Sequence, residues 1–153
     1  MNGNRDFRDL LQCLNEAGAK YLIVGAYAVM YHAEPRFTKD LDIWVEPTSD
    51  NAQKVWKALA KFGAPMADLT LDDLSNPDVV FQMGVEPNRM DIIMDIEGLQ
   101  FSEAWENRVI RKYDDQSVFV LSHDDITRVK KIAGRDQDLL DVKNLERAKK
   151  WKK

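Results

Sequence analysis

Two aspartates, Asp40 and Asp42, flank one leucine at the start of a short apolar run that ends at Val45. The run predicts a β-strand, and because successive strand side chains point to opposite faces, both carboxylates share one face. Two neighbouring carboxylates repel each other, and burying both without compensation is costly. A divalent cation such as Mg²⁺, which prefers oxygen ligands, relieves that repulsion. The pair therefore predicts a cation site, and the alternative interpretation is a plain polar strand face.

A third acid for the same site is available in segment 89–94, which predicts another strand. Asp91 and Asp95 fall on the same face of that strand. If the two strands are neighbours, one of these acids completes a cluster of three carboxylates. We choose Asp91, because it lies inside the strand among apolar residues whereas Asp95 lies at its end, and Asp95 stays open as the alternative.

A glycine turn precedes the acids in the chain. Gly25 stands between the apolar run 21–24 and a predicted short helix over 26–32. A glycine at this position lets the backbone approach a ligand closely, and the N-terminus of the following helix offers N–H groups and the positive end of its dipole. The turn therefore predicts a place for a triphosphate, with an ordinary strand-to-helix turn as the alternative.

The two features occur together in a recognisable order. Segment 21–26 reads Tyr-Leu-Ile-Val-Gly-Ala, and segment 36–43 reads Arg-Phe-Thr-Lys-Asp-Leu-Asp-Ile. The combination resembles the nucleotidyltransferase (polymerase-β-like) superfamily, whose pattern is an apolar residue, Gly, then Gly or Ser, a spacer and Asp-x-Asp. The later third acid of that pattern is matched by Asp91. Segments 35–42 and 121–138 are in addition similar to the small bacterial nucleotidyltransferase toxins of the AbiEii type.

The resemblance covers roughly residues 20–45 and 88–145, and it implies an activity. Such an enzyme moves NMP from an NTP to an acceptor hydroxyl and releases pyrophosphate, with Mg²⁺ or Mn²⁺ as cofactor. Two metal ions stabilise the entering and leaving oxygens in reactions of this kind. The implied catalytic and metal-binding residues are Asp40, Asp42 and Asp91. The implied nucleotide-binding residues are Gly25 and Ala26 in the turn, Arg36 and Thr38 just before the acids, and Lys130, Lys131 and Arg135 near the C-terminus.

The three basic residues have a second interpretation. Lys130, Lys131 and Arg135 either face the cleft and neutralise phosphate, or they form a solvated helix face. In the second case Arg135 pairs with Asp138, three residues further on. The phase of the helix leaves open which of the two lysines faces the cleft.

One position departs from the family pattern. Ala26 stands where Gly or Ser is usual, so the hydroxyl that could bind a phosphate oxygen is missing, although the backbone N–H remains. The complete acid triad favours catalysis. Ala26 favours a second hypothesis, a non-catalytic nucleotide- or partner-binding module that retains the fold. A third hypothesis is a structural domain whose acids bind no metal.

The acceptor stays open among RNA or tRNA, a protein hydroxyl and a small molecule. The base of the NTP is also open, with ATP among the candidates. The similarity to AbiEii-type proteins favours RNA or protein, with a role in a toxin-antitoxin system. Since the chain is short, a cognate partner protein or a homodimer is a candidate to complete acceptor binding.

These residues need a framework of helices and strands. Apolar spacing predicts helices over 6–17, 26–32, 49–62, 101–106, 122–133 and 136–150, and strands over 21–24, 41–45, 79–83, 89–94, 109–110 and 118–121. Ser49 is the predicted cap of the third helix, and Leu139, Val142 and Leu145 are the predicted inward face of the last. The order predicts an α+β fold, a nucleotidyltransferase-like mixed β-sheet flanked by helices, with C-terminal helices. We expect a single domain over 1–153, with its core at about 20–121 and a C-terminal helical segment at about 122–150.

Composition narrows the class of protein further. The length of 153 residues suits one domain. The overall formal charge of −4 hides a net charge of −10 over residues 1–126 and +6 over residues 127–153, which argues against a protein that coats nucleic acid nonspecifically. Cys13 is the only cysteine, which excludes an intrachain disulfide and a cysteine zinc site. The sequence shows neither a membrane-spanning run nor a signal peptide, so the expected location is the cytoplasm.

Overall fold

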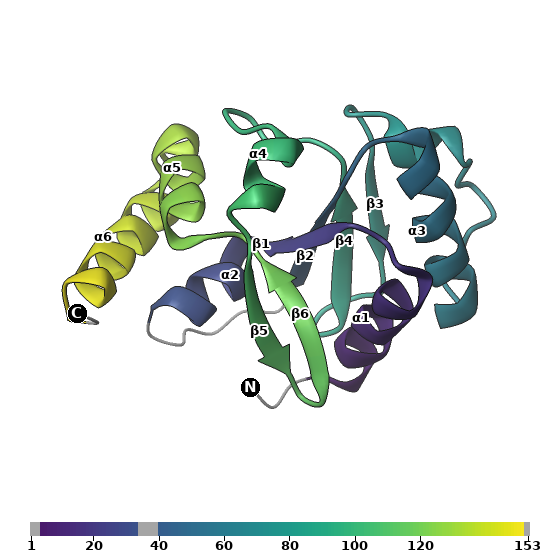
Figure 1. The fold of residues 1–153 in the computed structure, drawn as a ribbon, viewed down its shortest axis with the longest axis horizontal. Coiled ribbons are helices and arrows are strands. Elements are labelled where there is room, and N and C mark those ends of the chain that lie inside the picture. Colours follow the sequence, from purple (N-terminus) through teal and green to yellow (C-terminus); the bar gives the residue numbers. More distant parts are fainter. Residues whose placement is uncertain (1–3, 34–39, 152–153) are drawn as a thin grey trace.

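The computed structural model describes residues 4–33 and 40–151. Figure 1 shows an elongated arrangement with α3 towards one end and α5 and α6 at the other. In chain order the elements are α1 (Arg5–Ala17), β1 (Tyr21–Val24), α2 (Gly25–His32), β2 (Asp40–Val45), α3 (Ser49–Phe62), the 3₁₀ helix η1 (Asp72–Ser75), β3 (Val80–Met83), β4 (Arg89–Ile93), α4 (Phe101–Glu106), β5 (Val109–Tyr113), β6 (Gln116–Val120), α5 (His123–Ala133) and α6 (Asp136–Trp151).

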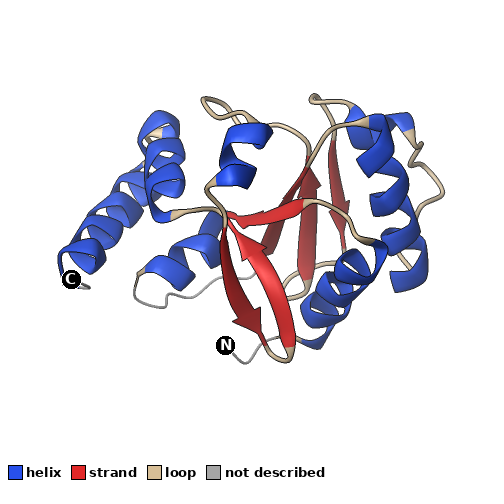
Figure 2. Cartoon of the chain, in the orientation of Figure 1, coloured by secondary structure: helices blue, strands red, loops and turns tan. Residues whose placement is uncertain are grey.

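The sheet has six strands in the order β3-β4-β2-β1-β6-β5. The pairs β2–β4 and β1–β6 are parallel, and the other three pairs are antiparallel. Figure 2 shows these strands in the middle of the molecule with helices around them. The predicted mixed sheet flanked by helices, with two helices at the C-terminus, is confirmed.

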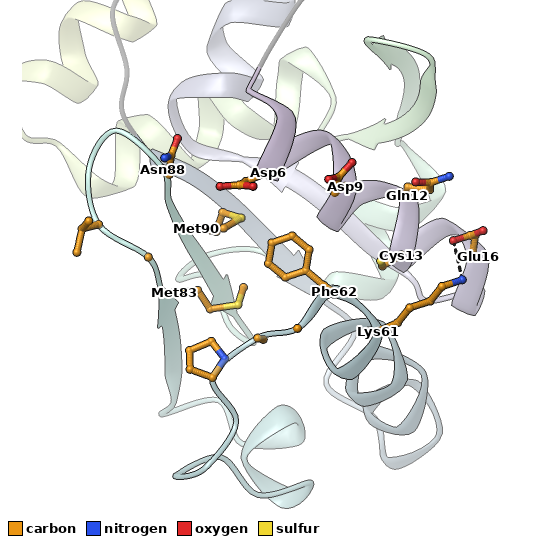
Figure 3. A pocket seen from close by; sticks show the side chains of 15 residues that line it. Asp6, Asp9, Gln12, Cys13, Glu16, Lys61, Phe62, Met83, Asn88 and Met90 are labelled. Atoms are coloured by element: carbon orange, nitrogen blue, oxygen red, sulfur yellow. Dashed lines mark hydrogen bonds and ion pairs between the residues drawn. The ribbon is translucent and has the colours of Figure 1, made fainter.

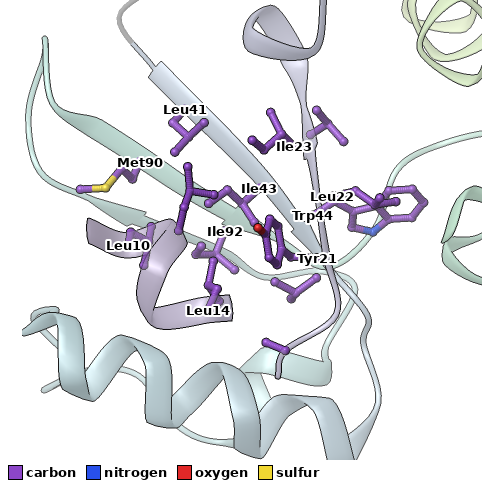
Figure 4. Close-up of a cluster of buried hydrophobic side chains, with 14 of the residues drawn as sticks. Leu10, Leu14, Tyr21, Leu22, Ile23, Leu41, Ile43, Trp44, Met90 and Ile92 are labelled. Atoms are coloured by element: carbon purple, nitrogen blue, oxygen red, sulfur yellow. The ribbon is translucent and has the colours of Figure 1, made fainter. Parts of the chain in front are cut away.

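The two faces of the central strands differ in character. On one face of β2 and β4, Leu41, Ile43, Met90 and Ile92 are buried against α1, which contributes Leu10, Leu14 and other apolar side chains (Figure 4). Alternation of side chains along a strand then sends the intervening aspartates to the opposite face. The apolar face thus fixes the direction in which the acids point.

One predicted helix cap is wrong by a single residue. Thr48, not Ser49, caps α3, and its Oγ1 accepts a hydrogen bond of 3.2 Å from the backbone N–H of Asn51. Both residues carry a hydroxyl, and cap chemistry alone does not choose between adjacent hydroxyl residues.

The predicted inward face of the last helix is also partly wrong. Val142 and Leu145 are buried as expected, but Leu139 is 46% exposed. In its place α6 buries Asp138 and Asp141, which bind Lys130 of α5. The helix is therefore turned so that Asp138 and Asp141, paired with Lys130, are buried together with Val142 and Leu145.

Two further segments differ from the prediction in extent. The strands predicted over 109–110 and 118–121 are the hairpin of β5 and β6, which pair antiparallel over their full lengths. Residues 64–77, where the sequence predicts neither a helix nor a strand, contain the 3₁₀ helix η1. In the described residues, no helix combines the length and apolarity needed to cross a membrane.

Candidate active site

The sheet brings the predicted acids together. In the parallel pair of β2 and β4, Asp42 lies directly opposite Asp91, and Asp40 lies directly opposite Arg89. Neighbouring strands are about 4.8 Å apart, so these side chains extend from adjacent positions on one face. Asp95 follows the end of β4 and is exposed. The register therefore pairs Asp91, and not Asp95, with the Asp40–Asp42 strand.

Gly25 closes the other side of this cluster. Antiparallel pairing of β1 with β2 sets Val24 opposite Asp42, so the next residue, Gly25, lies beside the Asp42 carboxylate. Gly25 has a φ of +65°, and a Cβ at this position would collide with Oδ2 of Asp42. Both the backbone conformation and the close approach therefore require glycine here. The helix α2 begins at this residue, and no side chain of the described residues caps its first N–H groups.

Arg89 binds the third acid directly. Its Nε donates to Oδ1 of Asp91 and its Nη2 donates to Oδ2, each at 3.1 Å. These hydrogen bonds, with the negative charges of Asp91, Asp40 and Asp42, raise the pKa of the Arg89 guanidinium. Sequence reasoning missed this contact, although the two residues stand two apart in one strand and so share a face.

The central acid of the cluster has an unusual affinity for a proton. Burial raises the pKa of Asp42 to about 6, and the negative charges of Asp91 and Asp40 add to the effect. The positive charges of Lys130 and Arg89 act in the opposite direction. Among the described residues, three carboxylates thus lie near these two cations, an arrangement that suits a further cation.

The two candidate lysines occupy different environments. Lys130 is buried, with its Nζ 3.1 Å from Oδ1 of Asp138 and 3.2 Å from Oδ2 of Asp141. Lys131 is exposed and lies 3.4 Å from Glu146. Because the charge of Lys130 lowers the pKa of Asp42, Lys130 is the lysine that acts electrostatically on the acid site.

Arg135 forms the ion pair with Asp138 that the alternative interpretation predicts. Its Nε donates to Oδ2 of Asp138 at 2.7 Å, and its side chain is 80% exposed. Burial of Asp138 works against ionisation, but the hydrogen bonds from Arg135 and Lys130 outweigh it and lower the pKa of this carboxyl. In this structure Arg135 therefore supports the α5–α6 turn.

The geometry agrees with a family assignment. The sequence matches, over residues 6–150, the family described as nucleotidyltransferase of unknown function (DUF6036). The chain belongs to this nucleotidyltransferase family. The match spans nearly the whole chain and confirms the resemblance to the nucleotidyltransferase superfamily.

A solved structure of similar fold adds to this assignment. It is the crystal structure of the lincosamide antibiotic adenylyltransferase LnuA with lincomycin bound. The TM-score is 0.61 at 17% sequence identity, over 94% of this chain and 96% of that chain. At this identity the likeness shows a shared fold. The chain matches no curated protein.

The donor set of this nucleotidyltransferase site suits a divalent cation. Asp40, Asp42 and Asp91 offer carboxylate oxygens, the ligands that Mg²⁺ prefers, and Gly25 leaves Oδ2 of Asp42 clear of any neighbouring Cβ. Within residues 4–33 and 40–151, no three His, Cys, Asp or Glu side chains are gathered as a metal-ligand set. Convergence of the three carboxylates would therefore require rotation of side chains that the strand register already places side by side.

Two predicted nucleotide-binding residues, Arg36 and Thr38, lie outside the described residues. Ala26 lies in the first turn of α2, directly after Gly25. Of the eight other predicted positions, the structure groups Gly25, Ala26, Asp40, Asp42, Asp91 and Lys130 around the acid face, and it separates Lys131 and Arg135 from it by their own ion pairs.

A cavity of about 690 Å³ lies elsewhere (Figure 3). Its lining includes acidic residues of α1 and the ion pair between Glu16 and Lys61, at 3.1 Å. Met90 also lines it, and strand alternation points Met90 to the face opposite Asp91. This cavity is therefore separated from the acid face by the sheet.

Proposed function

We propose that this protein is a Mg²⁺- or Mn²⁺-dependent nucleotidyltransferase that moves NMP from an NTP to an acceptor hydroxyl. The observation that carries the proposal is the register of β2 and β4, which sets Asp42 opposite Asp91 and beside Gly25. Three carboxylates next to a glycine turn at a helix N-terminus form a combination suited to a metal-chelated triphosphate.

Each group has a distinct role in this proposal. Asp40, Asp42 and Asp91 would hold the divalent cations, which would supply charge neutralisation at the phosphates and lower the pKa of the attacking hydroxyl. Gly25 and the first N–H groups of α2 bind the β- and γ-phosphate oxygens. The buried Lys130, held by Asp138 and Asp141, contributes a fixed positive charge towards the same phosphates.

The proton of the acceptor hydroxyl is assigned to Asp91 in this scheme. The new bond forms between the acceptor oxygen and the α-phosphorus, and the bond from that phosphorus to the pyrophosphate oxygen breaks. Asp91 faces Asp42 across the strand pair, so a proton acceptor and the cation ligands lie on the same sheet face.

The acceptor belongs to one of three chemical classes: RNA or tRNA, a protein hydroxyl, or a small-molecule alcohol. The AbiEii-type pattern supports the first two and a toxin-antitoxin role with a cognate partner. The fold shared with an adenylyltransferase whose structure contains lincomycin supports the third. A homodimer or partner chain would enlarge the acceptor surface in each case.

The decisive experiment uses each of the four α-labelled NTPs with Mg²⁺ or Mn²⁺ and three acceptor pools: total tRNA, lysate protein and hydroxylated small molecules. We expect label transfer into one pool, and we expect Asp42→Asn to lower the rate by at least about 1,000-fold because a cation ligand is lost. Asp50→Asn is the matched control, since Asp50 is an exposed aspartate of α3. Equal transfer by the wild type and Asp42→Asn would contradict the proposal.

Ala26 supports one alternative, a binding module without transfer. Its α2 N-terminus presents backbone N–H groups but no hydroxyl at that position. Metal-dependent NTP binding with no label transfer into any pool would favour this alternative. An Ala26→Ser variant that transfers label would then identify the missing hydroxyl as the reason.

A further inference from the structure

Arg89 occupies both oxygens of one proposed cation ligand. The two hydrogen bonds to Asp91 form a bidentate arrangement in which one planar guanidinium covers one carboxylate. Arg89 also lies directly opposite Asp40 in the strand pair. The Arg89 guanidinium thus provides positive charge at the edge of three carboxylates.

This ion pair is placed where it can open. The side chain of Arg89 is 33% exposed, whereas that of Asp91 is 12% exposed. Water solvates a partly exposed guanidinium well once it leaves, and a divalent cation would then neutralise the buried Asp91 carboxylate in its place. Lys130 differs, because two buried carboxylates of α6 hold it. Of these two described cations, Arg89 is therefore the one that a divalent cation can replace at the lower cost.

We propose that Arg89 is a built-in counter-ion, which stays on Asp91 until a divalent cation and an NTP displace it together. The inference rests on the proposed function. A divalent cation alone must compete with Arg89 for the oxygens of Asp91. An NTP brings phosphate oxygens that accept the displaced guanidinium, so the nucleotide and the metal favour each other's binding. Since coupling between two ligands is reciprocal, the metal strengthens NTP binding by the same factor.

The test measures binding rather than activity. Mn²⁺ binding is titrated by electron paramagnetic resonance, with and without a non-hydrolysable NTP analogue, in wild type, Arg89→Gln and Arg89→Lys. We expect Arg89→Gln to bind Mn²⁺ alone about tenfold more tightly, because a competing positive charge is removed. We also expect the analogue to improve Mn²⁺ binding several-fold less in Arg89→Gln than in wild type. Arg89→Lys, which cannot bind both oxygens at once, should fall between the two.

Arg111→Gln is the matched control, since Arg111 is an exposed arginine of β5, at the opposite edge of the sheet from β3. It removes the same charge and should leave both Mn²⁺ titrations unchanged. Unchanged or weaker Mn²⁺ binding by Arg89→Gln overturns the inference. If Arg89→Gln does not fold, the Nε–H resonance of Arg89 in wild type decides: it should shift when Mg²⁺ and the analogue are added together, and a resonance that does not shift overturns the inference.

The failure of this inference differs from the failure of the proposed function. Wild-type Mn²⁺ binding that Asp42→Asn abolishes, combined with no effect of Arg89→Gln, rejects the counter-ion role alone. If neither wild type nor Arg89→Gln binds Mn²⁺ in the presence of the analogue, the proposed cation site and the counter-ion role are rejected together.

Discussion

Two ionic clusters lie near each other in this molecule, and they differ in their balance of charge. Between α5 and α6, Lys130 and Arg135 bind Asp138 and Asp141, so two cations meet two carboxylates. On the face of β2 and β4, within the part of the chain that the structure describes, Arg89 binds Asp91 directly and lies beside Asp40 and Asp42. Among the described residues, the first cluster pairs two cations with two carboxylates, and the second sets one directly bound cation beside three carboxylates.

The difference separates a structural ion pair from a ligand site. In the balanced cluster, hydrogen bonds lower the pKa of Asp138 in spite of its burial. In the acid cluster, burial and like charges raise the pKa of Asp42 to about 6. A carboxyl pKa that is raised by burial, and further by neighbouring carboxylates, marks an acid that a bound cation would stabilise.

The largest effect on stability is expected in the balanced cluster. Lys130→Met should lower the free energy of unfolding by about 3 kcal/mol, because it leaves two buried carboxylates without their shared cation. Urea denaturation measures the loss. Lys149→Met is the control, since Lys149 and Asp124 form an exposed pair at 2.9 Å, and it should cost less than about 1 kcal/mol. Equal losses in the two variants would contradict the expectation that the buried ion pairs of Lys130 stabilise the fold more than an exposed pair does.

A second pair of variants tests the close approach of Gly25 to the acid cluster. Gly25 and Gly63 both have positive φ, but a Cβ at Gly63 has no heavy atom within 4 Å. Gly63→Ala should cost about 1 kcal/mol of unfolding free energy from backbone strain alone. Gly25→Ala should cost about 2 kcal/mol or more, because the added methyl group must also displace the Asp42 carboxylate. Chemical denaturation compares them, and identical costs would argue against that contact.

The sequence predicts much of this arrangement, because its local signals are strong. The alternation around Asp40 and Asp42 predicts their common face, and Gly25 marks the turn beside them. The pairing of Asp42 with Asp91 is harder to predict from the sequence, since it depends on parallel pairing of two strands that are far apart in the chain. A single sequence contains no direct signal for that register.

The C-terminal helix shows where apolar periodicity fails. Spacing predicts Leu139 as an inward residue, yet α6 buries Asp138 and Asp141 and exposes Leu139. In the sequence alone, two aspartates at these positions indicate a solvated helix face. Only the fold shows that a buried cation, Lys130, binds them. The choice between Lys130 and Lys131 was open for the same reason, because helix phase depends on partners in another helix.

The two clusters should also respond differently to acid. In metal-free protein, Asp42 has a pKa of about 6 in the folded state against an ordinary value of 3.8. The folded state therefore binds a proton more readily, and its stability falls as the pH rises from about 4 to about 6. Asp138 has a lowered pKa, so its contribution is present above about pH 4 and is lost only below that.

The Asp42→Asn variant tests the pH dependence of stability that arises from Asp42. In EDTA, the stability of the variant relative to wild type should increase by on the order of 1–2 kcal/mol when the pH rises from 4.5 to 7.5. This energy includes a discount for solvent screening. Urea denaturation at the two pH values measures the gain. A gain of the same size in Asp50→Asn, at an exposed position, would assign the effect to net charge and not to the buried cluster.

The smallest effect is expected at Lys131, one residue from the cation of the balanced cluster. Its ion pair with Glu146 is more than half exposed on both sides, at 3.4 Å, so Lys131→Gln should change the unfolding free energy by less than about 0.5 kcal/mol. It should also leave the KM for NTP within about twofold, since a solvated lysine is screened from the phosphates. Steady-state kinetics check this prediction. A tenfold rise in KM would indicate that the phosphates of the NTP contact the exposed side of α5. A KM that responds to Lys130 and not to Lys131 would instead assign the electrostatic contribution at the acid site to Lys130.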